Sequence, residues 1–213
     1  MVEKKVKKRG AGRPTGGAGN KHDEIIAAAL ETLRETHPDG LTVSEVARRA
    51  GVDPAMVRYY FTNKEGLLVE AAKFLMEKLL NTASTIVHAE ADISVRLTER
   101  LKGMMKFLME NPYLHTLLNR VYSSASPDAR QMMADVNGRS MMLMAELLRS
   151  SEQSVRELDP RFVHCALIGV SEAMLNARPL IEYMFGVETT SPDFVDRYAG
   201  AMAELLARGL IRD

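Results

Sequence analysis

The chain of 213 residues has few of the features that disulfide-bonded, secreted or membrane proteins require. Its single cysteine, Cys165, excludes an intramolecular disulfide and fits a reducing compartment. No apolar run approaches the roughly 20 residues of a bilayer-spanning helix, and no apolar segment of a signal peptide follows the basic residues at the start. We therefore expect a cytoplasmic protein with no membrane partner.

Metal-binding and catalytic patterns are also lacking. His115 and His164 have no second histidine or cysteine at ligand spacing. His88, Glu90 and Asp92 do have such a spacing, but they fall at the end of a predicted helix, where solvated polar side chains are the ordinary case. No nucleophile–base motif is recognisable. We predict no catalytic residue, no metal and no cofactor, and hence no enzyme; a helical enzyme with an unrecognised site is one alternative.

The formal net charge of zero hides an asymmetry along the chain. Residues 1–22 hold seven lysines and arginines and one acidic residue, and residues 1–68 have a net charge of +3. The rest of the chain has a net charge of −3. A basic head on a mildly acidic body predicts a polyanionic partner at one end only.

No alternating β-type pattern is present, so an all-α fold of about nine helices is expected. Four prolines stand near proposed helix starts, where proline is tolerated. The predicted helices span residues 21–36, 43–50, 54–60, 63–87, 92–110, 112–122, 127–150, 160–177 and 192–208. The predicted domains are a disordered basic arm at 1–20, a helix-turn-helix domain at 21–68 and a larger helical body at 69–213.

The most informative stretch is residues 41–67, which reads as two short helices across a tight turn, followed by a third helix. Thr42 and Glu45 have the Thr-x-x-Glu spacing of a capping box at the start of the first helix. Gly51 follows the last residue of that helix, where the chain needs a left-handed backbone conformation that glycine adopts at little steric cost. This arrangement places one exposed helix face in the major groove of DNA.

The start of the second helix is equally well marked. Asp53 supplies an N-cap, and Pro54 occupies the first helical position, where its missing amide is not needed. A second capping box, from Thr62 to Glu65, is expected to open the following helix.

The period of the second helix assigns its faces. Val57 and Phe61 mark the buried side, so Ala55 and Tyr59 point away from the core, with Met56 and Arg58 on the flanks. Arginine can bond guanine or phosphate, and alanine can contact a thymine methyl group. Lys64, in the first turn of the next helix, is suited to a phosphate docked at that terminus. An ordinary helical hairpin with solvated charges is the alternative.

The run GVDPAMVRYYFTNKEGL, residues 51–67, resembles the DNA-binding domain of the TetR family of bacterial transcriptional regulators. The family usually shows an aliphatic residue, Tyr, any residue, His, Phe, and then Lys-Asp/Glu two residues further on. Arg58 replaces the usual tyrosine here and Tyr60 the usual histidine, whereas the other positions match. The resemblance is specific over roughly residues 20–70 and architectural beyond them. The candidate DNA-binding residues are Arg13, Thr42, Val43, Asp53, Pro54, Ala55, Met56, Arg58, Tyr59, Tyr60 and Lys64.

Arg13 belongs to the Gly- and Lys-rich stretch of residues 1–20. Such a stretch is either a solvated tail or an arm laid into the minor groove. In the second case Gly12 and Pro14 keep the chain slim, and Arg13 inserts where a narrow A·T groove attracts a cation.

The resemblance implies a small-molecule pocket among the middle helices of the body. Eight of the fourteen methionines fall in residues 104–109 and 132–144, and methionine adapts to varied apolar partners. Ordinary core filling is the alternative reading of each one. The candidate pocket residues are Met104, Leu108, Tyr113, Met133, Met144, His164 and Ile168.

The resemblance also implies that the last two helices pair with their copies in a homodimer. Small residues permit close helix approach, between chains or within one. The candidate interface residues are Gly169, Ala173, Ala199, Gly200 and Ala203. The expected function is that of a homodimeric repressor on double-stranded DNA, released from a palindromic operator by a small apolar or amphipathic effector. An activator or an architectural DNA-binding protein without an effector is the alternative.

Overall fold

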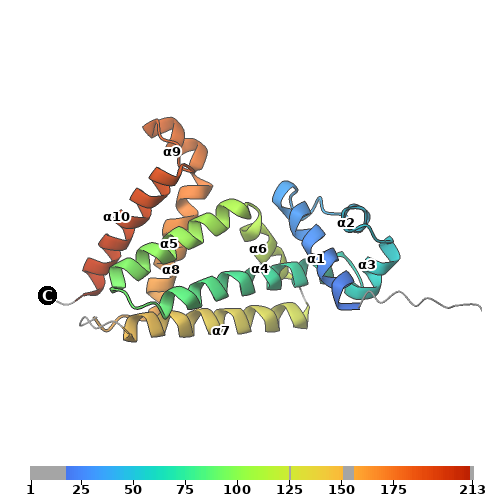
Figure 1. Cartoon of the computed structure of the whole chain (residues 1–213), viewed down its shortest axis with the longest axis horizontal. Coiled ribbons are helices and arrows are strands. Elements are labelled where there is room, and N and C mark those ends of the chain that lie inside the picture. The colour runs from blue at the N-terminus through green and yellow to red at the C-terminus, as the bar shows by residue number, and fades with distance from the viewer. Residues whose placement is uncertain (1–17, 125, 151–155, 212–213) are drawn as a thin grey trace, which may run out of the picture.

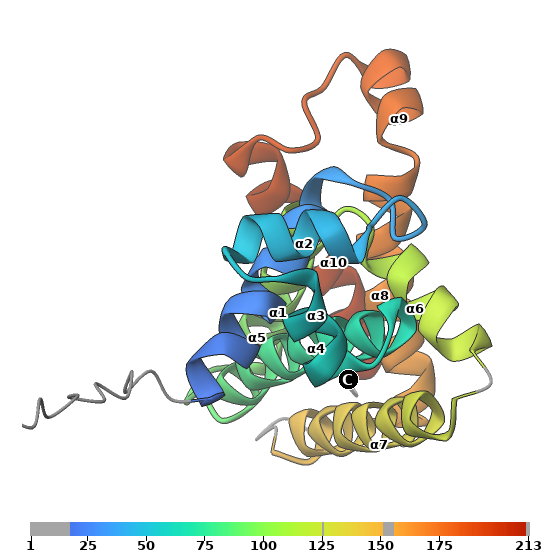
Figure 2. The same cartoon turned by 90° about the vertical axis from the view of Figure 1, so that its right-hand side faces the viewer.

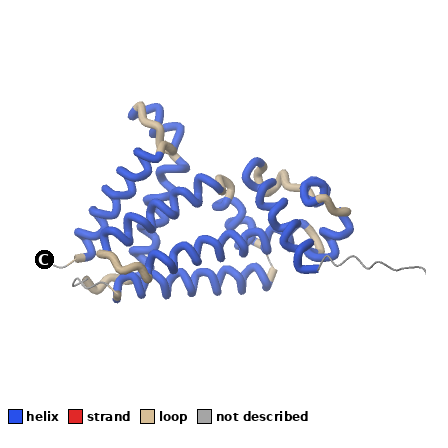
Figure 3. Tube along the Cα trace, viewed as in Figure 1, coloured by secondary structure: helices blue, strands red, loops and turns tan. Residues whose placement is uncertain are grey.

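A computed structural model of the chain describes residues 18–124, 126–150 and 156–211. These residues form ten helices and no β-strand, so the predicted all-α class is confirmed (Figure 3). The helices are α1 (Ala18–Glu35), α2 (Val43–Ala50), α3 (Pro54–Phe61), α4 (Lys64–Val87), α5 (Ile93–Glu110), α6 (Leu114–Ser123), α7 (Pro127–Arg149), α8 (Pro160–Asn176), α9 (Arg178–Phe185) and α10 (Pro192–Leu210).

The first three helices form a head at one end of the molecule, opposite the C-terminus (Figure 1). Helix α4 runs without interruption from this head into the body, so the predicted domain boundary after residue 68 falls inside a helix. One apolar cluster extends from Ile25 on α1 through α4 to Val136 on α7. The head therefore has no core separate from that of α4.

A second apolar cluster lies in the part of the body away from the head, where α5 packs against α10 and α8. Leu97 and Leu101 on α5 are fully buried there, and so are Ala199 and Ala203 on α10. The body therefore has two cores, joined along α4, α5 and α7. None of the described helices is long and apolar enough to span a membrane.

Helix α9 was not predicted. It projects from the body in both views (Figures 1 and 2), and none of its residues is buried. Its boundaries nevertheless follow local rules, because a proline lies in its first turn and Gly186 ends it with φ of 63°. The helix has no buried apolar side chains at helical spacing, which is the pattern that usually predicts a helix from a sequence.

The start of α4 differs from the predicted second capping box. Asn63, not Thr62, is the N-cap, and its Oδ1 accepts a hydrogen bond of 2.9 Å from the Gly66 amide. Thr62 instead reverses the chain after α3 with φ of 61°, a region that β-branched residues rarely adopt. A Cβ at Gly66 would collide with the carbonyl oxygen of Phe61. The close approach of α3 to α4 therefore requires glycine at position 66.

This contact makes Gly66→Ala destabilising. Replacing a glycine inside a helix by alanine ordinarily stabilises a protein by about 0.5–1 kcal/mol. At Gly66 the collision is with backbone, so we expect a loss of about 1–3 kcal/mol in the free energy of unfolding, measured by urea titration. The matched control is Gly138→Ala on α7, where the new Cβ meets nothing within 4 Å and the ordinary gain is expected. A Gly66→Ala variant as stable as Gly138→Ala would contradict the assignment.

Candidate nucleic-acid interface

Helices α2 and α3 meet across the predicted turn and lie together on the outer face of the head (Figure 2). Thr42 caps α2, its Oγ1 accepting from the Glu45 amide at 3.2 Å. Gly51 has φ of 63°, and its amide closes the last turn of α2 on the Arg48 carbonyl oxygen. The reciprocal bond of a capping box does not form among the described residues, because the Glu45 carboxylate is engaged by arginines.

Helix α3 begins as predicted and extends one residue further, to Phe61. Asp53 Oδ1 accepts a hydrogen bond of 2.7 Å from the Ala55 amide, and Pro54 occupies the first turn. Val57 and Phe61 are buried in the shared core. The opposite face of α3 is exposed, and this exposure fixes which side chains are free to meet a ligand.

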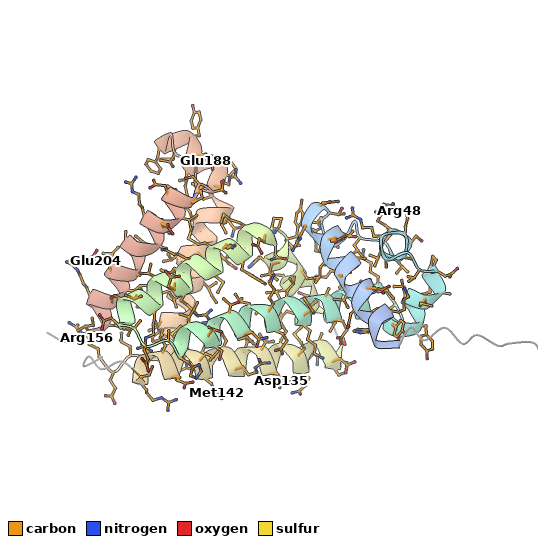
Figure 4. All side chains as sticks on the ribbon, viewed as in Figure 1. Arg48, Asp135, Met142, Arg156, Glu188 and Glu204 are labelled. Carbon is orange, nitrogen blue, oxygen red and sulfur yellow. The ribbon has the colours of Figure 1, made fainter. Side chains whose placement is uncertain are left out.

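The basic residues of α2 are neutralised within the head. Arg48 Nη2 lies 2.6 Å from Glu45 Oε1, and Arg49 Nη2 lies 2.5 Å from Glu35 Oε2. Hydrogen bonds from Arg48 and then Arg49 lower the pKa of Glu45 to about 2. Figure 4 places Arg48 on the outer side of the head. The Arg49–Glu35 pair holds α2 to α1, and the two pairs together leave little uncompensated charge on α2.

The exposed face of α3 has a different character. Arg58 is exposed and forms no ion pair with any residue in the described ranges. Tyr59 beside it is 83% exposed, which is unusual for a large aromatic side chain in a folded protein. Ala55 and Met56 complete the face. A free guanidinium, a phenol and two apolar side chains on one short helix are a surface that can contact phosphates and base edges.

The other predicted contact residues lie at the margins of this face. Val43 and Tyr60 are partly buried against the core, and the Tyr60 ring packs edge to face with His22 of α1 at 5.9 Å between centroids. Lys64 Nζ donates to the carbonyl oxygen of Asp39 at 2.7 Å, so this ammonium group holds the turn between α1 and α2. Arg13 lies outside the described residues.

A cluster of charged groups joins the head to the body. Arg120 near the end of α6 donates to both oxygens of Glu65 at the start of α4, at 3.1 and 2.5 Å. The same guanidinium pairs with the Asp39 carboxylate in the α1–α2 turn. His37 in that turn packs edge to face with Tyr113, with ring centroids 5.7 Å apart. We call these contacts of Arg120, Asp39 and Glu65 the junction.

The structure brings together some of the predicted pocket residues and separates others. Leu108 lines a cleft of about 420 Å³ between the ends of α5 and α8, together with His115 and Glu172. Tyr113 belongs to the contact with the head described above. Met104, Met133 and Ile168 belong to the shared core, and Met144 belongs to the second core. Whether these side chains meet an effector stays a prediction.

Sequence reasoning missed the polar groups nearest to His164. His164 Nε2 lies 3.3 Å from Ser140 Oγ on α7. Burial, and then the charge of Arg100 on α5, lower the pKa of His164. Arg100 is itself 95% buried, with 5% of its surface exposed. No local signal marks such an arginine, because arginine on a helix is ordinarily assigned to the solvated face.

The predicted dimer residues fall into two groups. Gly169 and Ala173 lie on an exposed stripe of α8, beside Phe162, which is 71% exposed. Ala199 and Ala203 are fully buried within one chain, where α10 packs against α5, so their assignment to a dimer interface is wrong. Their small side chains serve the close approach of two helices of the same chain. Gly200 is partly exposed, and Leu205 is the most exposed large apolar residue of α10, at 64%.

Two family models match the chain. One, described as bacterial regulatory proteins of the tetR family, matches residues 25–71, and the other, described as a tetracyclin repressor-like C-terminal domain, matches residues 92–213. The first match covers the head and the start of α4, and the second covers nearly all of the body.

Curated relatives match part of the chain. The HTH-type transcriptional regulator BetI of Rhizobium meliloti is 33% identical over 78 residues, which are 37% of this chain and 38% of that protein. BetI of Serratia proteamaculans is 25% identical over 145 residues, which are 65% of this chain and 72% of that protein. The chain thus matches about two fifths of the length of the Rhizobium relative.

Solved structures share the whole architecture. The transcriptional regulator FadR from Bacillus subtilis, in complex with stearoyl-CoA, superposes with a TM-score of 0.66 at 19% identity, covering 88% of this chain and 98% of that one. The TetR family transcriptional regulator PfmR from Thermus thermophilus does so with a TM-score of 0.64 at 22% identity, covering 88% and 99%. These likenesses show the fold.

Proposed function

Because the chain belongs to the tetR family of bacterial regulatory proteins, we propose that it is a homodimeric repressor that holds a palindromic operator and is released by a small effector. The single observation that carries the DNA-binding part is the exposed face of α3. Arg58 on it has no intrachain counter-charge among the described residues, and Tyr59 on it is 83% exposed. Groups left free in this way on the second helix of a helix-turn-helix are suited to the major groove.

The homodimer is proposed through the exposed stripe of α8 and the exposed side of α10. Phe162, Gly169 and Ala173 on α8 present an apolar, closely approachable surface, and Leu205 is exposed on α10. A two-fold dimer presents two copies of α3 about one DNA turn apart, roughly 34–36 Å, or a multiple of that spacing. Such a dimer reads a palindrome.

Release by an effector is proposed to act through α4. Since α4 belongs both to the body and to the core of the head, an effector that favours a different position of α4 also changes the spacing of the two heads. The coupling in such systems is typically about 1–3 kcal/mol. Arg13 is proposed to add a minor-groove contact from the N-terminal arm.

Mapping the DNA bound by the purified full chain tests this function. Random or genomic fragments retained by the protein are sequenced, and the expected product is a palindrome whose half-sites are centred one helical turn, about 10–10.5 base pairs, or a multiple of it apart. Affinity for this site should exceed that for unrelated DNA by about 1,000-fold or more at physiological salt. A common affinity for all fragments would indicate an architectural DNA-binding protein instead. Transcription in vitro from the mapped site then separates repression from activation.

A further inference from the structure

Arg100 is a buried cation without a counter-charge. Only 5% of its surface is exposed, yet it forms no ion pair and donates no hydrogen bond to any residue within 18–124, 126–150 or 156–211. Burial lowers the pKa of its guanidinium to about 10, so the group remains charged at neutral pH. An unpaired charge in an interior is strongly unfavourable, and removing it by an apolar substitution is often stabilising. The position therefore calls for a functional explanation.

Two polar side chains from other helices approach the same place. His164 on α8 is partly exposed, and its Nδ1 is buried with no hydrogen-bond partner in the part of the chain that the structure describes. Its Nε2 lies 3.3 Å from the hydroxyl of Ser140 on α7, which is only 7% exposed. The charge of Arg100 is near enough to contribute to the lowered pKa of His164, after the larger effect of burial. Helices α5, α7 and α8 thus each supply one polar group, and Arg100 and His164 each have nitrogen atoms that bind no described residue.

Apolar side chains lie between this polar group and the end of α5. Met104 and Ile168 follow Arg100 and His164 by four residues, which is one helical turn on the same face, and both pack in the shared core. Leu108 lies one turn beyond Met104 and lines the cleft of about 420 Å³ at the end of α5. The axial distance from Arg100 to Leu108 is about 12 Å. A polar end and an apolar path of this length match an amphipathic molecule.

We infer that Arg100, Ser140 and His164 form an anion subsite, and that the effector is an aliphatic carboxylate whose chain follows α5 toward Leu108. This inference rests on the proposed function for the role of the ligand as an effector. The guanidinium fork matches both oxygens of a carboxylate, and a proton on His164 Nδ1 supplies a further donor. Binding gives the buried Arg100 cation a counter-charge. The ligand therefore favours the state in which α5, α7 and α8 surround the carboxylate.

Three probes with the same ten-carbon chain test this inference: decanoate, 1-decanol and decyltrimethylammonium. Binding to the full chain is measured by calorimetry and thermal melting, without DNA. Decanoate should bind at least about tenfold more tightly than decanol, because hydrogen bonds to a charged group are worth about a factor of ten or more. The cationic probe should not raise the melting temperature.

Substitutions locate the site. Arg100→Met keeps the side-chain length and removes the charge, so it should lower decanoate affinity about tenfold or more and leave decanol affinity unchanged. Arg139→Met is the matched control, because Arg139 on the same body is partly exposed and paired with Glu77 at 2.5 Å; it should bind decanoate like the wild type. His164→Gln provides a second variant if Arg100→Met does not fold, and it should weaken decanoate binding selectively.

Equal binding of decanoate and decanol would overturn the inference. Wild-type decanoate affinity in Arg100→Met would also overturn it. If Arg100→Met does not fold, wild-type affinity in His164→Gln is the outcome that would do so. Failure of the proposed function has a different signature, because operator binding is measured separately and without any probe. A protein that holds its operator but prefers decanol contradicts only the anion subsite. A protein that binds decanoate through Arg100 but recognises no operator contradicts only the regulatory role.

Discussion

Tyr59→Ala should reduce operator affinity by at least about thirtyfold while leaving the melting temperature nearly unchanged. A good base contact is worth about 1–3 kcal/mol, and a two-fold dimer loses it twice, so the expected cost is about 2–6 kcal/mol per operator. Stability should change by no more than about 0.5 kcal/mol, because Tyr59 is 83% exposed and packs mainly against Tyr60. Fluorescence anisotropy with the mapped operator measures the affinity.

A matched control is available in the same chain. Tyr183 on α9 is 88% exposed and lies far from the head, so Tyr183→Ala should bind the operator like the wild type when both variants are compared as dimers (Figure 1).

Arg58→Ala tests whether the exposed face of α3 contacts phosphates. If Arg58 contacts a phosphate, its loss should reduce the slope of log affinity against log salt by about 1 for each contact. Wild-type affinity in both Tyr59→Ala and Arg58→Ala would show that α3 is not the reading helix.

Lys64 is a less suitable test residue than its sequence position suggests. Its ammonium group donates to the Asp39 carbonyl oxygen, so Lys64→Ala removes a tertiary contact as well as any phosphate contact. Loss of binding in that variant would leave the two explanations unresolved. The contact between Lys64 and Asp39 joins residues 25 positions apart, so the sequence around the start of α4 does not predict it.

The head was largely predictable because its signals are local. Thr42, Gly51 and Asp53 act on amides or dihedral angles within three residues of themselves, and each takes the predicted role. The exception is the start of α4, where Thr62 and Asn63 are both good caps. The choice between them depends on how closely α3 approaches Gly66, which is a tertiary contact.

The body was predictable as helices but not as a set of contacts. Small residues such as Ala199 and Ala203 indicate close packing, but the same pattern serves two helices of one chain or of two chains. Arg100 is buried although its residue type favours the surface, since three helices converge on it. Helix α9 has terminal signals but buries no residue, and a pattern with no inward stripe does not reveal a helix.

Arg120→Gln should leave operator binding intact and remove most of the response to an effector. Arg120 connects α6 of the body to Asp39 and Glu65 of the head, contacts that are 81 and 55 residues distant in the chain. Without them, a movement of α6 no longer carries the α1–α2 turn with it. The change in operator affinity on effector binding, typically about 5–150-fold in such systems, should fall to within about threefold. Operator titrations with and without decanoate, or with a compound found by a melting screen, measure this response.

Hydrogen exchange tests the junction without any effector. Partly exposed ion pairs contribute about 1 kcal/mol, so the amides around Asp39 and at the start of α4 should exchange about fivefold faster in Arg120→Gln. Arg139→Gln is the control, because Arg139 joins α7 to Glu77 on α4 through a similarly exposed pair that does not touch the head. If Arg120→Gln kept both wild-type exchange at Asp39 and the full effector response, coupling would have to pass through α4 and the shared core alone. In that case substitutions in the core between α4 and α6, at Leu117 or Val121, should alter the response while the charged junction does not.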